Sequence, residues 1–320
     1  MKIEKTAFTV ESNCKPNIIR GYFCSPVVKA NAKAVIVIAH GMAERKERYD
    51  EFTSFLAQNG YAVFIHDHLG HGESVENDDY LGFFGEEDGW KTLVEDCYTI
   101  TNYAREIFPN KPLILFGHSM GSFVARAFAE MHPLTLDGAI FCGTSGANPA
   151  AGIAVKLADF IARSKGNFYR SEFINAVAFG AYNKKIKPQR TDFDWLTRDN
   201  EIVDKYVADK YCGFLFTACG YRDLFSVLKY VSGKNWYKGV RKNLPMYLIA
   251  GDADPVGEYG AGVKQVVSDL KKTGHENVEI KLYKGGRHEI LNETDRNIVM
   301  DDILVWLDKT TGNTSDSDEA

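Results

Sequence analysis

Long apolar runs, paired-cysteine motifs and an excess of basic charge are all missing from this 320-residue sequence. No stretch approaches the roughly 18 uninterrupted apolar residues of a membrane-spanning helix, and the first residues lack the apolar run of a signal peptide. Lysine and arginine number 38 against 43 acidic residues, and this net charge of −5 argues against a general nucleic-acid binder. We therefore expect a cytoplasmic protein that does not bind nucleic acid.

Cysteine and glycine patterns exclude further classes. The six cysteines are scattered, and none belongs to a C-x-x-C pair of the kind found in zinc ribbons and redox sites. A bridge between Cys14 and Cys24, across an expected hairpin, is the one disulfide to consider, but reduced thiols are the favoured state. There is no G-x-x-x-x-G-K-[ST] loop, and no G-x-G-x-x-G follows the first buried strand. We expect no cofactor.

What is present is the composition of a globular protein, with 45% hydrophobic and 25% charged residues. Short apolar runs alternate with helical patterns, for example those over residues 119–131 and 294–309, as in β-α-β units. This order predicts an α/β fold with a mostly parallel central sheet flanked by helices. The expected strands, after an N-terminal hairpin over residues 6–25, cover residues 34–39, 61–65, 112–116, 138–142, 246–250 and 278–283.

The strand–helix alternation stops over residues 146–239. This stretch is rich in aromatic residues and has the pattern of successive helices, expected over residues 153–163, 171–179, 200–208 and 221–231. Because the alternation resumes near Leu244, we interpret the stretch as a helical cap inserted into one core made of residues 1–145 and 240–310. Residues 311–320 are polar and acidic, which predicts a disordered tail.

The segment with the most specific chemistry is Gly117-His118-Ser119-Met120-Gly121. It follows an expected strand and begins an expected helix, the context of a nucleophile elbow. Gly117 and Gly121 leave room for a turn that is tight enough to expose the serine hydroxyl, and the helix N-terminus favours negative charge beside it. Ser119 is therefore the candidate nucleophile.

A nucleophilic serine needs a base and an acid that orients the base. Downstream, Gly251-Asp252-Ala253-Asp254 follows the expected strand 246–250, and His288 follows the strand 278–283. The order serine, acid, histidine along the chain is that of a hydrolase triad. His288 is the candidate base, and the acid is one of the two closely spaced aspartates.

An oxyanion hole requires two backbone N–H groups aimed at the tetrahedral intermediate. The residue after the nucleophile, Met120, should supply one of them. The second should come from Met42, in the loop His40-Gly41-Met42-Ala43-Glu44 after the first buried strand, where Gly41 allows a sharp turn.

These segments, together with Asp67-His68-Leu69-Gly70-His71-Gly72, stand in the order and spacing of a known family. The chain resembles the monoacylglycerol lipase / lysophospholipase-like branch of the α/β-hydrolases, which is grouped with serine aminopeptidases. The resemblance covers about residues 10–310. It implies cofactor-free hydrolysis of carboxylic esters of monoacylglycerols or lysophospholipids, and its G-x-x-D pattern selects Asp254 as the acid. Asp194-Trp195-Leu196-Thr197-Arg198-Asp199 is similar to a cap segment of bacterial members, which implies a bacterial source.

One pattern indicates a different chemistry. His66, His68 and His71 fit H-x-H-x-x-H, a spacing used by dinuclear zinc hydrolases. Those enzymes place an aspartate before the third histidine, whereas this chain has Gly70 there, and no further acid and histidine cluster would complete a second site. We therefore expect no metal.

The expected cap decides specificity. Ile153, Leu157, Phe160 and Ile161 share one helical face, and Phe173, Ile174 and Val177 share another. Most should pack the cap onto the core, and some should line an acyl tunnel or touch a membrane surface transiently. Alternatives on the same scaffold are a peptidase or amidase, a feruloyl-type esterase, a perhydrolase or haloperoxidase-like enzyme, and a non-catalytic binder. The complete set of Ser119, Asp254 and His288 argues against a binder.

Overall fold

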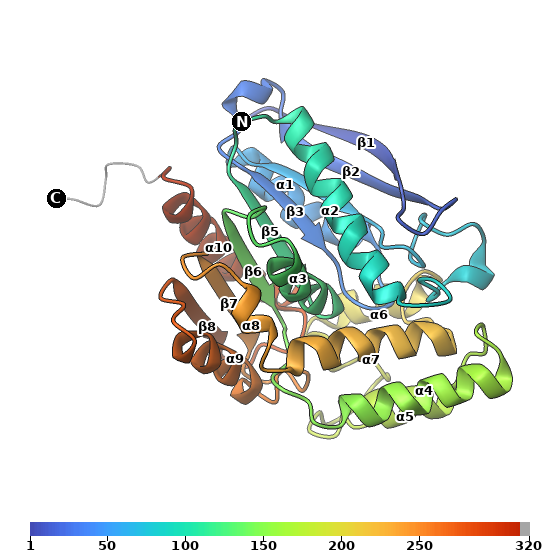
Figure 1. Ribbon diagram of the computed structural model, residues 1–320. Coiled ribbons are helices and arrows are strands. Elements are labelled where there is room, and N and C mark those ends of the chain that lie inside the picture. Colours follow the sequence, from blue (N-terminus) through green and yellow to red (C-terminus); the bar gives the residue numbers. More distant parts are fainter. Residues whose placement is uncertain (314–320) are drawn as a thin grey trace.

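An eight-stranded sheet with the order β1-β2-β4-β3-β5-β6-β7-β8 forms the centre of the computed structural model, which describes residues 1–313 (Figure 1). The strands β3 to β8 run parallel to one another, and the hairpin β1–β2 joins β4 in antiparallel pairing. The predicted fold class is confirmed. The strands are β1 (Ile3–Glu11), β2 (Ile18–Pro26), β3 (Val35–Ala39), β4 (Ala62–His66), β5 (Leu113–His118), β6 (Gly138–Cys142), β7 (Met246–Gly251) and β8 (Val278–Tyr283).

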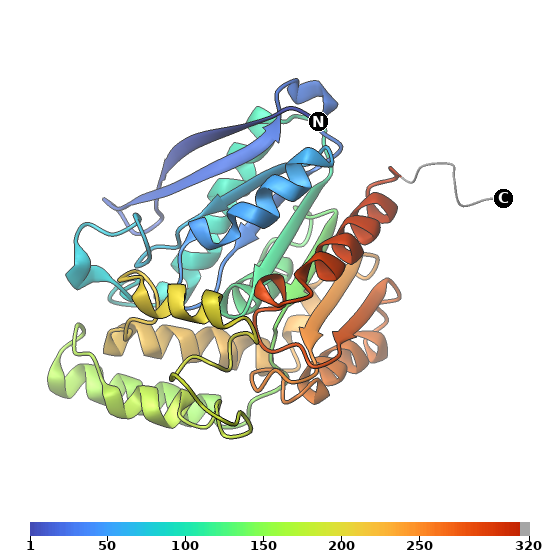
Figure 2. The same cartoon turned by 180° about the vertical axis from the view of Figure 1, so that it is seen from behind.

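Helices cover both faces of this sheet, as the two opposite views show (Figures 1 and 2). The strand β3 is apolar throughout because both of its faces are buried. Val35 and Val37 enter one core cluster, whereas Ile36 and Ile38 enter the other. The first cluster includes side chains of α2 (Gly89–Ile107), α3 (Met120–Met131) and α9 (Ala261–Lys272). The second includes side chains of α1 (Asp50–Gln58) and α10 (Arg296–Thr310).

Between β6 and β7 the chain is helical, and its helices gather at one end of the sheet (Figure 1). Among the described residues of this stretch, strand pairing is limited to one isolated bridge, between Arg170 and Thr217. The longest pair, α4 and α7, pack against each other, and α7 also packs on α3 of the core. The helices are α4 (Ala151–Lys165), α5 (Glu172–Phe179), α6 (Asn200–Ala208), α7 (Ala218–Ser232) and α8 (Trp236–Gly239).

The end of the chain differs in part from the prediction. Residues 311–313 of the expected disordered tail continue α10 as a turn, in which the Thr311 amide donates to the Leu307 carbonyl at 2.9 Å and the Asn313 amide to the Asp308 carbonyl at 2.8 Å. The remainder of that expected tail, residues 314–320, lies outside the described residues. None of the helices within residues 1–313 is long and apolar enough to cross a membrane.

The parallel register places all candidate site residues at one edge of the sheet. Ala39, at the end of β3, pairs with Gly117 of β5, and His118 pairs with Cys142 of β6. The strands β7 and β8 follow next to β6, so the loops that carry Asp254 and His288 leave the sheet at the same edge. Ligand sites of open α/β sheets lie outside these carboxyl ends.

Candidate active site

Ser119 sits on a sharp turn between β5 and α3. Its backbone angles, φ 53° and ψ −120°, lie where non-glycine residues are rarely found, and such strain is typical of functional positions. The Ser119 amide donates to the Cys142 carbonyl at 3.0 Å, which ties the turn to β6. A Cβ atom on Gly117 would collide with the Gly121 carbonyl, and one on Gly121 would collide with the Ala39 carbonyl. Both glycines are therefore required by close backbone approach.

His288 and Asp254 form a buried pair. His288 Nδ1 lies 3.0 Å from each carboxylate oxygen of Asp254, and both side chains are almost fully buried. Asp254 Oδ1 also accepts the Val256 amide at 2.8 Å, which fixes the carboxylate. Because Nδ1 donates to this carboxylate, the neutral imidazole presents Nε2 as a free acceptor. Nε2 has no hydrogen-bond partner among the described residues.

Asp252, the other acid of the same loop, has a different role. It is exposed, and its Oδ1 accepts the Gly285 amide at 2.6 Å. This hydrogen bond joins the loop after β7 to the loop after β8, but the carboxylate does not contact His288. The structure thus distinguishes two aspartates that lie two residues apart.

The loop after β3 also lies close to Ser119. Gly41 leaves little room for a side chain, since a Cβ there would lie 2.7 Å from Glu44 Oε1 and 3.1 Å from Ser119 Cβ. The Gly41 amide donates to Glu44 Oε1 at 2.5 Å, and the Ala43 amide donates to His71 Nε2 at 3.1 Å. Met42, between them, lines the same cavity as Ser119 and Met120.

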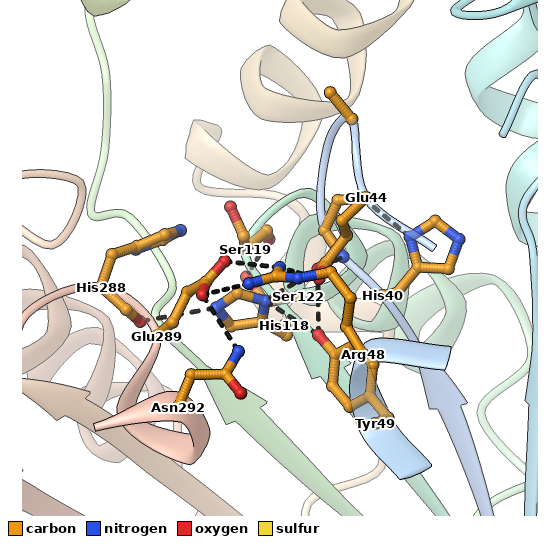
Figure 3. A network of polar contacts seen from close by, with 12 residues as sticks. His40, Glu44, Arg48, Tyr49, His118, Ser119, Ser122, His288, Glu289 and Asn292 are labelled. Carbon is orange, nitrogen blue, oxygen red and sulfur yellow. Dashed lines mark hydrogen bonds and ion pairs between the residues drawn. The ribbon is translucent and has the colours of Figure 1, made fainter. Parts of the chain in front are cut away.

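A buried charged network connects this loop to the histidine loop (Figure 3). Arg48 donates to Glu44 Oε2 at 2.6 Å and, with two nitrogens, to both oxygens of Glu289 at 2.7 and 2.6 Å. Glu289 directly follows His288. The Arg48 side chain is 11% exposed, and both carboxylates are buried. Removing one partner of a buried ion pair costs about 3–5 kcal/mol, so loss of Arg48 would strongly destabilise this network.

His118, directly before Ser119, joins the same network. Its Nδ1 lies 3.0 Å from the Tyr49 hydroxyl and 3.2 Å from Glu44 Oε1, and its Nε2 lies 3.4 Å from the His288 carbonyl (Figure 3). Burial opposes protonation of His118, but the hydrogen bond and charge of Glu44 outweigh it and raise the His118 pKa. Burial would raise the Glu44 pKa, yet the Arg48 guanidinium, with His118, holds it well below its usual range.

The three histidines of the H-x-H-x-x-H pattern are fully buried below the loop after β3. His66, His68 and Cys97 each place one ligand atom within 4.8 Å of the others. However, His66 Nε2 and His68 Nδ1 already hydrogen bond to each other at 3.2 Å, and burial raises the pKa of the Cys97 thiol, which disfavours a thiolate ligand. His71 faces the Ala43 amide instead. The expectation of no metal stays a prediction.

A cavity of about 1280 Å³ opens above Ser119, between the sheet edge and the helices that follow β6. This volume exceeds the ~300–1,000 Å³ of a typical small-molecule site. Apolar side chains of the helical stretch form much of its wall, including Leu157, Ile174, Phe179, Leu224, Phe225 and Leu228.

The structure brings together all the candidate residues of the sequence analysis at this cavity or directly beneath it. Ser119, Met42, Met120 and His288 line the cavity, and Asp254 lies behind His288. Sequence reasoning missed Arg48 and Glu289 and gave Glu44 and His118 no role. Arg48 follows Glu44 by four residues in a stretch of mostly charged residues, which by itself suggests a solvent-exposed surface. Only the contact with Glu289, 241 positions away, indicates the role of Arg48.

The fold and this site define an α/β-hydrolase. Residues 30–295 match the model of one hydrolase family, described as serine aminopeptidase, S33. Because the match covers most of the chain, the chain belongs to that family, which confirms the resemblance noted in the sequence.

Similar proteins are found in several organisms. A monoacylglycerol lipase of Mycolicibacterium smegmatis is 28% identical over 280 residues, or 86% of this chain and 88% of the relative. A monoglyceride lipase of Rattus norvegicus is 26% identical over 279 residues, or 86% of this chain and 82% of the relative. The crystal structure of a thermostable carboxyl esterase from Bacillus coagulans, in complex with glycerol, superposes with a TM-score of 0.89 at 29% identity, covering 97% of this chain and 99% of that one.

Proposed function

We propose that this protein is a serine hydrolase that cleaves carboxylic esters of the monoacylglycerol or lysophospholipid type through an acyl-enzyme intermediate. The observation that carries the proposal is a strained serine on a strand–helix turn, at one cavity with a histidine whose Nδ1 is bonded to a buried aspartate. The substrate class rests on the relatives named monoacylglycerol and monoglyceride lipase.

Each residue of the triad has one task in this mechanism. Ser119 Oγ attacks the ester carbonyl while His288 Nε2 takes its proton, which forms the tetrahedral intermediate. His288 then gives that proton to the departing alcohol, and the acyl group remains on Ser119. A water molecule, activated by the same nitrogen, releases the acid. Asp254 keeps the Nδ1–H tautomer and stabilises the imidazolium.

We assign the oxyanion to the amides of Met42 and Met120. Both amides next to Met42 donate to protein acceptors, Glu44 and His71, and Met42 lines the cavity beside Ser119, which favours the Met42 amide as the donor of this loop. Met120 begins α3, where helical amides lack intrahelical acceptors and the helix dipole favours negative charge. Each such donor contributes about 3 kcal/mol to transition-state stabilisation.

Residues 146–239 serve in this proposal as the cap that supplies acyl specificity. The side chains that this stretch contributes to the cavity wall are mainly apolar, and an apolar acyl pocket gains roughly 0.8 kcal/mol for each buried methylene. A feruloyl-type ester remains the alternative substrate, because Tyr182 and Trp195 also line the cavity.

Activity should therefore depend on acyl length. With p-nitrophenyl esters of increasing length, kcat/KM is expected to rise about fourfold for each methylene that is buried, until the pocket is filled, and then to fall. Amides should be much slower, because the leaving amine must be protonated, and EDTA should have no effect. A flat profile from acetate upward, or aminoacyl amides that are cleaved faster than every ester, would contradict the substrate class.

We further propose a transient contact of the cap with membrane surfaces. Ile153 and Phe160 of α4, and Phe173 and Val177 of α5, are apolar side chains between 61% and 72% exposed. Both helices belong to the end of the cap that is farthest from the sheet (Figures 1 and 2). Large exposed apolar side chains on neighbouring elements are typical of interaction surfaces.

The double variant Phe160→Asp/Phe173→Asp tests this contact, since neither side chain lines the cavity. Sedimentation with phosphatidylcholine vesicles should recover less of the variant than of the wild type, by about tenfold, because two carboxylates replace two inserted rings. Hydrolysis of soluble p-nitrophenyl acetate is the control and should be unchanged. Equal sedimentation of both proteins would refute the contact.

A cytoplasmic location is also proposed. All six cysteines, including Cys14 and Cys24, are free, so the hairpin disulfide considered from the sequence is not formed. Unpaired thiols are the usual state in a reducing compartment. The similarity of residues 194–199 to a cap segment of bacterial relatives supports a bacterial source.

A further inference from the structure

The segment Asp194–Asp199, between α5 and α6, runs directly along the loop that carries His288. We call residues 194–199 the strap. The His288 amide donates to the Trp195 carbonyl at 3.3 Å, and the Glu289 amide donates to the Leu196 carbonyl at 2.7 Å. The backbone of the proposed base is thus hydrogen bonded to the cap as well as to the core.

Side chains attach the strap to the same loop. Arg287 Nη1 donates to the Asp194 carbonyl at 2.6 Å and to the Thr197 carbonyl at 2.9 Å. The buried Thr197 hydroxyl donates to the Asn292 carbonyl at 2.8 Å. A segment that only covered the cavity would need no particular anchor, whereas these bonds all converge on residues 287–292.

The Trp195 side chain extends this contact to the imidazole itself. Its ring centroid lies 5.0 Å from that of His288, with the planes tilted by 40°, and Tyr182 packs edge-on against Trp195 at 4.8 Å. The Asp254 carboxylate fixes the Nδ1 side of the imidazole, and the His118 ring of the core lies 4.9 Å away between centroids, so the freedom that remains to the ring is a tilt toward the cap. A large ring packed against the imidazole restricts that tilt and thereby the direction of Nε2.

We propose that the strap, through Trp195, is a positioning element for His288, so that the cap takes part in proton transfer and not only in acyl binding. This inference rests on the proposed role of His288 as base. Trp195 acts through His288 and is a positioning residue. Because Trp195 also lines the cavity, its contribution to substrate binding must be separated from its effect on the imidazole.

Kinetics of Trp195→Ala and Trp195→Phe on two esters separate the two roles. p-Nitrophenyl acetate has almost no acyl chain to bind, whereas p-nitrophenyl decanoate has a long one. Since a misplacement of about 1 Å can cost ~10²-fold in rate, Trp195→Ala should lower kcat by 10- to 100-fold on both esters, with KM for acetate unchanged. Trp195→Phe keeps a packed ring and should recover most of that kcat.

Two further variants serve as controls. Phe225→Ala removes another aromatic side chain of the cavity wall and should raise KM for decanoate. Trp306→Leu removes a buried tryptophan of α10, which belongs to the core cluster on the α1 and α10 face of the sheet. This variant should have a lower Tm, while kcat of the folded protein stays near the wild-type value. If Trp195→Ala does not fold, Thr197→Val takes its place. It removes one hydrogen bond of the strap and should lower kcat several-fold on both esters.

The inference is overturned if folded Trp195→Ala, or Thr197→Val in its place, hydrolyses acetate with wild-type kcat, or if its loss is confined to KM for decanoate. Either result would make the strap a part of the acyl site only. The His288→Ala variant is assayed in parallel. If that variant retains acetate hydrolysis, the proposed function fails, whatever the strap variants show.

Discussion

Ser119→Ala is expected to lower kcat for p-nitrophenyl esters by at least ~10³-fold and to leave the protein folded. The reaction loses its nucleophile, whereas the fold loses one hydroxyl at the wall of the cavity. Steady-state kinetics and circular dichroism of the purified variant measure both effects. A variant with more than a tenth of the wild-type kcat would contradict the assignment.

Ser122→Ala is the matched control, since Ser122 lies in the first turn of α3, three residues after Ser119. Its hydroxyl donates to the Ser119 carbonyl at 2.6 Å and is buried. Removing such a hydrogen bond costs about 1 kcal/mol of stability. We therefore expect a small decrease in Tm with little loss of kcat.

The second large effect is expected at the acid. Asp254→Asn should lower kcat by about 10⁴-fold, because an amide at this position stabilises the wrong tautomer of His288. Asp252→Asn changes an exposed acid that bonds the Gly285 amide, and its kcat should stay within a few-fold of the wild type. Parallel assays of the two variants on one ester give the comparison. Equal losses, or the larger loss at Asp252, would show that the orienting acid has been misassigned.

The parts of the site that could be predicted from the sequence are those encoded by neighbouring residues. The elbow around Ser119 has its glycines, strand and helix within a few positions, and the structure has β5 and α3 in those places. The choice of Asp254 over Asp252 depended on a family pattern, because both acids follow the same strand. The contact between Asp254 and His288 is visible only in the structure.

Contacts between distant segments could not be predicted. Arg48 bonds to Glu289, 241 positions away, and Trp195 bonds to the backbone of His288; no local pattern encodes either pairing. The apolar faces expected over residues 153–163 and 171–179 carry similar residues on several sides. In the structure Ile174 is buried and lines the cavity, whereas Phe173 is exposed. Helical periodicity predicts an apolar face of a helix, but it does not predict what that face contacts.

An acyl-enzyme formed on Ser119 is the central intermediate of the proposed reaction. The most direct measurement is intact-mass analysis of the wild-type protein after reaction with a fluorophosphonate, followed by peptide mapping of the adduct. We predict one adduct per chain, on the peptide that contains Ser119, and no adduct in the Ser119→Ala protein. An adduct mapped to another residue, or retained labelling of Ser119→Ala, would contradict the claim.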